Sequence, residues 1–108
     1  MSKKKVPRTE RIHGQRIKCY AKAPTKFADP YTVVFIDQYD TRTRQYFARG
    51  MSARPCHPQG VGMGAETRPG PHLGRKISFE DLPVDCRLLV EQDARGFPME
   101  SEVTHEQA

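Results

Sequence analysis

The sequence predicts a small α+β domain in which an antiparallel sheet of about four strands packs against one C-terminal helix. Three observations lead to this fold class. Short β-branched and aromatic segments fill the first half of the chain, one amphipathic segment lies near the C-terminus, and a glycine- and proline-rich stretch separates them. In a chain of 108 residues with 36% hydrophobic residues, these elements make one domain, which we expect to span 16–97.

Three strands are expected before the glycine-rich stretch. Residues 16–23 (RIKCYAKA) alternate between apolar and polar or basic side chains, which is typical of a half-buried strand. Residues 31–38 (YTVVFIDQ) contain an unbroken apolar run, which indicates a central strand covered on both faces. The polar residues 39–44 predict a hairpin turn, and 45–49 (QYFAR) then returns antiparallel.

Residues 50–74 predict a long, shaped loop. They contain six glycines, four prolines and two histidines, with no apolar period. Such a composition excludes a helix or a central strand. Long loops within compact domains are usually either functional or disordered, and this one lies between two segments that read as folded. We therefore expect the loop to carry part of the function.

A short strand and the helix follow this loop. Residues 76–79 (KISF) predict the strand, Asp81 an N-cap, and Pro83 the first helical turn. Gly96 is expected to end the helix in a left-handed conformation, and Phe97 to fold back as an anchor. The core-facing stripe follows helical spacing: Leu82, Cys86, Leu89 and Val90.

Charge is unevenly distributed along the chain, whose net charge is +5. Residues 1–26 hold nine Lys/Arg and one acid, and we expect 1–15 to be a disordered basic arm. Residues 91–108 carry a balance of −4, and 98–108 are expected to be a disordered acidic tail. Three cysteines, the charged N-terminus and the absence of a long apolar run predict a cytoplasmic protein without a membrane span.

The basic arm and the hairpin predict contact with an anionic partner, most simply nucleic acid, whether DNA or RNA. If both lie on one face, their side chains could hold phosphates while Tyr20 or Tyr46 stacks on bases. The alternative interpretation is a solvated arm that keeps the protein soluble. The candidate nucleic-acid-binding residues are Lys3, Lys4, Lys5, Arg8, Arg11, Arg16, Arg42, Arg44, Arg49 and Arg54.

Two segments, GMSARPCHPQGVG (50–62) and HLGRKISFEDLPVDCRLLV (72–90), carry a resemblance to known sequences. With their HPQG turn and HLGxxIxFxDLPxDC run, they resemble short uncharacterised proteins of bacterial and phage-related mobile elements. The resemblance implies no activity, only a setting in which small proteins often bind and modulate a host or defence protein. The alternative function is therefore protein binding through the loop. Its expected contact residues are Met51, His57, Gln59, Arg68 and His72.

Metal-binding and catalytic sites are weakly indicated. Cys56 and His57 are adjacent, which is poor geometry for one ion, and Cys19 and Cys86 fit the core better. The ladder Gly60-Val61-Gly62-Met63-Gly64 lacks the ending of a P-loop. We expect no metal, cofactor or catalytic residue. A small hydrolytic or phosphoryl-transfer enzyme stays open as a third hypothesis, built on His57, Glu66, Arg68 and His72.

Overall fold

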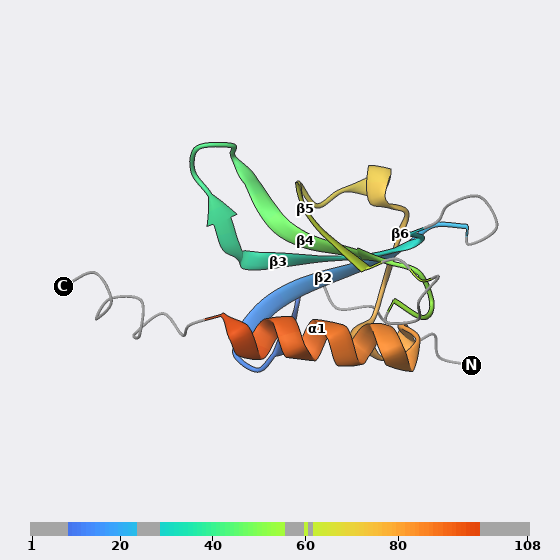
Figure 1. Cartoon of the computed structure of the whole chain (residues 1–108). Helices are drawn as coiled ribbons and strands as arrows, with labels where there is room; N and C mark the ends of the chain where they lie inside the picture. Colours follow the sequence, from blue (N-terminus) through green and yellow to red (C-terminus); the bar gives the residue numbers. More distant parts are fainter. Residues whose placement is uncertain (1–8, 24–28, 56–59, 61, 98–108) are drawn as a thin grey trace, which may run out of the picture.

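The computed structural model describes residues 9–23, 29–55, 60 and 62–97. These residues form an antiparallel sheet and one helix, α1 (Val84–Gly96), which lies along one face of the sheet (Figure 1). The α+β class with a C-terminal helix is therefore confirmed. The described sheet has six strands, more than the four or so expected, in the order β1-β2-β3-β4-β5, with β6 paired to β2.

Three strands form the middle of the sheet: β2 (Gln15–Ala21), β3 (Tyr31–Asp40) and β4 (Gln45–Met51). They match the three strands expected before residue 50, and the turn between β3 and β4 falls within the predicted segment. Val33 and Phe35 are fully buried toward α1, and Val34 is fully buried on the opposite face. The apolar run therefore belongs to a central strand that is covered on both sides, as predicted.

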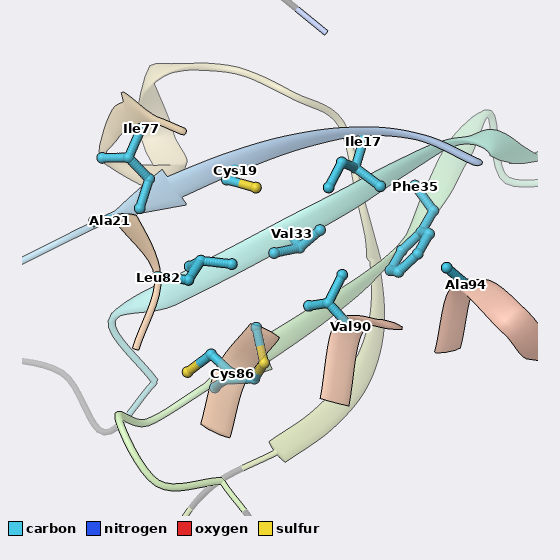
Figure 2. Close-up of a cluster of buried hydrophobic side chains, with 11 residues drawn as sticks. Ile17, Cys19, Ala21, Val33, Phe35, Ile77, Leu82, Cys86, Val90 and Ala94 are labelled. Atoms are coloured by element: carbon cyan, nitrogen blue, oxygen red, sulfur yellow. The ribbon is translucent and has the colours of Figure 1, made fainter. Parts of the chain in front are cut away.

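The main core lies between the sheet and α1 (Figure 2). Side chains of β2 and β3 meet a stripe of α1 that comprises Cys86, Val90 and Ala94, all at most 1% exposed. Leu89 is only partly buried beside this core. Just after the helix, the ring of Phe97 packs edge-on against Phe35, with 5.3 Å between ring centroids, so the expected anchor is confirmed.

The boundaries of the helix differ from the prediction. Pro83, rather than Asp81, is the N-cap of α1. The carboxylate of Asp81 instead accepts the backbone N–H of Ser78 at 3.2 Å and stabilises a preceding 3₁₀ turn, η2 (Phe79–Asp81). Strand β6 (Arg75–Ile77) consequently ends two residues earlier than expected. Among the described glycines, positive φ angles occur at Gly14 and Gly74, so the left-handed cap expected at Gly96 is wrong.

A short N-terminal strand, β1 (Glu10–Ile12), lies inside the segment assigned to the basic arm. It pairs with β2 through a tight turn in which His13 and Gly14 have φ angles of 49° and 84°. Two consecutive positive φ angles suit the twist of a two-residue hairpin. The expectation that residues 1–15 form a disordered arm is therefore wrong for residues 10–12. Residues 1–8 and 98–108 lie outside the described part of the chain.

Strand β5 (Gly62–Thr67) lies inside the predicted loop and pairs with β4 over its whole length. A glycine-rich segment can form a strand here because main-chain hydrogen bonds to β4 hold it, and it needs no side chains in the core. The composition of residues 50–74 was expected to exclude a central strand, and this is confirmed, since β5 is at the edge of the described sheet. The expectation of a continuous loop over 50–74 is wrong, and a 3₁₀ turn, η1 (Pro71–Leu73), forms a second ordered part.

Candidate nucleic-acid interface

The register of the sheet decides which side chains lie opposite α1. On β2, Ile17 and Cys19 point into the core beneath the helix. Because successive side chains of a strand alternate between faces, Arg16, Lys18 and Tyr20 point to the other face. Direct cross-strand partners share a face, so the strand pairings extend this assignment across the whole sheet.

Four basic residues gather on this face at the end of the sheet formed by β1, β2 and β6. Arg11 of β1 lies directly opposite Arg16, and Lys76 of β6 lies directly opposite Tyr20. Lys18 is on β2 between these two pairs. Arg11 and Arg16 are exposed, whereas Lys18 and Lys76 are partly buried. We call this group the basic sheet face: Arg11, Arg16, Lys18 and Lys76.

One acidic residue, Asp37 on β3, contacts the basic sheet face. Its carboxylate accepts the backbone N–H of Arg16 at 2.9 Å and the side-chain Nε–H at 2.8 Å, and the guanidinium Nη2 lies 2.7 Å from Oδ1. Burial acts to raise the pKa of Asp37, but the hydrogen bonds and charge of Arg16 outweigh it and hold the pKa below its ordinary value. Asp37 therefore stays ionised and neutralises one of the four positive charges.

The surroundings of Lys76 lower its pKa. Burial lowers the pKa of Lys76, the negative charge of Glu10 acts in the opposite direction, and the positive charge of Lys18 lowers the pKa further. The net result is a pKa below the ordinary lysine value. The basic sheet face thus brings four cations together, with the carboxylate of Asp37 bound to Arg16 and the charge of Glu10 acting on Lys76.

The aromatic side chains on this face do not lie where base stacking was expected. Tyr20 is only 6% exposed and packs with Leu73 of η1, so it cannot serve as a stacking platform. Figure 1 shows η1 on the side of the sheet opposite α1. Tyr46 is half-buried and contacts Tyr39 of β3, with 4.9 Å between ring centroids. Tyr39 is 46% exposed and is the aromatic surface that a base could reach.

The other predicted arginines do not join this face. Arg49 is on the helix side, where two hydrogen bonds of 2.8 and 2.6 Å join it to Asp93 of α1. It therefore holds the fold together and is unavailable to phosphate. Arg42 and Arg44 belong to the β3–β4 turn, and Arg54 is exposed beyond the end of β4. The predicted arginines of the described residues are thus divided among four places. Lys3, Lys4, Lys5 and Arg8 lie outside the described residues.

The predicted loop contacts are also divided. Met51 is 0% exposed and belongs to the core, so its assignment to a contact surface is wrong. It ends β4 on the helix side of the sheet, opposite Tyr31 of β3, and packs into the core there. Arg68 is exposed and donates to the carbonyl of Arg44 at 3.1 Å, and His72 is exposed with Nε2 3.1 Å from the hydroxyl of Thr67. His57 and Gln59 lie outside the described residues.

Glu66 is separated from Arg68 and His72, the other described members of the candidate enzyme site. Within the described residues, no hydrogen bond or ion pair joins Glu66 to Arg68 or His72, and the register places Glu66 on the helix side of β5. No group of three or more His, Cys, Asp or Glu is placed to hold a metal ion in the same part of the chain. Cys19 and Cys86 are core residues, as predicted, and burial raises the pKa of the Cys19 thiol far above its ordinary value.

The sequence contains a partial signal for the basic sheet face. Lys18 follows Arg16 at the two-residue spacing of a strand. A strand over 16–23 therefore places both side chains on the same face. Lys76 had no such local signal, because only the pairing of β6 with β2 brings it there. None of the helices in the described part of the chain is long and apolar enough to cross a membrane.

Comparisons with protein-family models, curated proteins and solved structures find no match to this chain. The resemblance to proteins of mobile elements therefore stays a prediction.

Proposed function

We propose that this protein is a non-catalytic module that binds nucleic acid electrostatically through the basic sheet face. The observation that carries the proposal is the pairing of like charges on that face. Arg11 and Arg16 are direct cross-strand partners, and the charge of Lys18 lowers the pKa of Lys76. Like charges that face each other across strands destabilise a sheet. A bound polyanion would remove this cost.

Phosphate groups suit the geometry of this face. Its cations lie on β1, β2 and β6, which pair side by side. Arg16 and Lys18 are alternate residues of β2, and such residues are about 6.7 Å apart. Arginine can bind phosphate through two hydrogen bonds, and lysine supplies a compact positive charge. Tyr39, at the far end of β3, offers an exposed ring on which a base could stack. The basic residues of the N-terminal arm, next to β1 in the sequence, would add further phosphate contacts.

The test is fluorescence anisotropy with a labelled single-stranded oligodeoxynucleotide and its duplex over a range of salt concentrations. We expect binding that weakens with salt. The variant Arg11→Gln/Lys18→Gln should lower the affinity and reduce the slope of log K against log salt by about 1.4 on the single strand and about 1.8 on the duplex. Circular dichroism should show a melting temperature that is unchanged or raised, since both side chains reach solvent and the variant removes two like-charge contacts.

A matched control removes two other exposed arginines, Arg42→Gln/Arg54→Gln, and changes the net charge by the same amount. We expect this control to keep most of the affinity and slope. If it weakens binding as much as the first variant, the sheet face is not the interface. Binding that is indifferent to salt contradicts the electrostatic mechanism altogether. Deletion of residues 1–8 measures the contribution of the arm without disturbing β1.

A second candidate function is the binding of a host or defence protein through residues 50–74. It is favoured by the exposed apolar side chain of Met63, which is 56% exposed on β5. A pull-down after nuclease treatment distinguishes the two functions. A protein partner that survives nuclease and is lost in Arg68→Ala/His72→Ala supports this candidate, whereas loss of all partners on nuclease treatment contradicts it. Both substituted side chains are exposed, so the variant should fold.

A further inference from the structure

The two edges of the sheet differ in how they resist pairing with another strand. At one edge, β1 and β6 have three residues each and carry Arg11, Arg75 and Lys76. Short, charged strands are a common way to prevent unwanted pairing at an edge. At the other edge, β5 has six residues, Gly-Met-Gly-Ala-Glu-Thr, without lysine or proline. The edge formed by β5 is therefore longer and carries a single charge, Glu66, so it is less protected than the other edge.

The backbone of β5 is accessible. Its first five residues are exposed, and no other described strand pairs with its outer side. Glycine at two positions and alanine at a third leave little side-chain bulk near the main chain. The outward N–H and C=O groups of such a strand can bind an extended chain by β-augmentation.

We propose that β5 pairs with β5 of a second copy of this chain, antiparallel and around a two-fold axis perpendicular to the sheet. This arrangement joins the two sheets into one continuous sheet and covers two less protected edges at once. A second copy is favoured over an unrelated peptide because its strand has the matching length and because no like charges meet, as the register shows.

The register follows from the faces of β5. Met63, Ala65 and Thr67 lie on one face, and Gly62, Gly64 and Glu66 on the other. A two-fold axis perpendicular to the sheet keeps each face on its own side, so the pairing centres on Gly64 or on Ala65. In the first register Glu66 lies opposite Gly62 of the second copy, and in the second it lies opposite Gly64. The one charge of β5 thus never faces its own copy.

The positive net charge of the chain does not oppose this pairing. The basic sheet face is centred on β2, and seven strand spacings of about 4.8 Å, on the order of 34 Å, separate β2 from its copy across the interface. The Debye length at physiological ionic strength is about 8 Å. Repulsion between the two basic faces is therefore screened almost completely.

The test uses the full chain and measures its mass by sedimentation equilibrium over a range of protein concentrations, together with hydrogen exchange of the backbone amides. We expect a monomer–dimer equilibrium in which dimerisation slows exchange in residues 62–67. Met63→Lys should raise the dissociation constant at least about tenfold, because a lysine on an edge strand opposes pairing with another strand.

Leu88→Lys is a matched control, because Leu88 is 59% exposed on the outer side of α1 and Met63 is 56% exposed on β5. The control should dimerise like the original chain. A monomer at every concentration overturns the proposal, and so does a dimer whose 62–67 amides exchange as fast as those of the monomer. A dimer disrupted by Leu88→Lys and kept by Met63→Lys would place the interface on the helix and also overturn it.

Discussion

The ion pair between Arg49 and Asp93 joins β4 to α1, and its removal tests how the helix is held to the sheet. The guanidinium donates to both carboxylate oxygens, at 2.8 and 2.6 Å, and it also lies 5.5 Å from the centre of the Phe47 ring. The two side chains are only 19% and 13% exposed. Arg49→Met keeps much of the aliphatic packing and leaves Asp93 without its partner.

The expected loss lies between two limits. Removal of one partner from a fully buried pair costs about 3–5 kcal/mol, and surface pairs contribute about 0.2–1 kcal/mol. Because the Arg49–Asp93 pair keeps a small solvent exposure, we expect Arg49→Met to lower the free energy of unfolding by about 2–3 kcal/mol. For a domain of this size, that corresponds to a fall in melting temperature of roughly 10–20 °C.

The assay is urea unfolding of Arg49→Met, Asp93→Leu and the double variant. Replacement of both charges by apolar side chains should cost less than either single change, because no unpaired charge then stays buried. Arg95→Met is the control: its partner Glu91 is one helical turn away and its side chain is 60% exposed, so the loss should be under about 0.5 kcal/mol. Additive single losses, or a loss for Arg49→Met as small as the control's, would refute this account.

Two further predictions concern pH and the backbone. The Asp37–Arg16 pair lowers the pKa of Asp37 in the folded state, so its stabilisation is present above the unfolded-state pKa of about 3.9 and is lost as pH falls through the folded-state value. Asp37→Asn should flatten the acid dependence of stability by less than about 1 kcal/mol, since both side chains are partly exposed, and equal acid slopes in thermal melts at several pH values would contradict this. Gly74 has φ +106°, and a Cβ there would lie 2.2 Å from the carbonyl oxygen of Ala21. Gly74→Ala should therefore cost more than about 2 kcal/mol in chemical unfolding, whereas Gly96→Ala, with nothing within 4 Å, should be neutral or stabilising; equal effects would show that the strain is absent.

Local patterns predicted the middle of this fold because the forces that form it act within a few residues. The run around Val33–Ile36 predicted a covered strand, and the stripe that includes Cys86 and Val90 predicted the buried side of a helix. The edges were harder to predict. β1 is three residues long and β5 is rich in glycine, and each exists because a neighbouring strand supplies its hydrogen-bond partners.

The candidate site was predictable only in part, because strand pairing decides which side chains share a face. Arg11 and Arg16 were named from charge alone, and the sheet places them side by side on one face. Arg49 had the same residue type, yet its position on the opposite side of β4 makes it a partner of Asp93. Met51 was assigned to a surface loop, but it is the last residue of β4 and its side chain is buried on the side of α1.

Composition and periodicity thus determined that the chain folds as one α+β domain, that its C-terminal segment is an amphipathic helix, and that its basic residues outnumber the acidic ones. Strand pairing decided which basic residues share a face and which edge of the sheet is less protected. The physical reason is that side-chain alternation is local, whereas the register that aligns one strand with another depends on contacts between residues far apart in the chain.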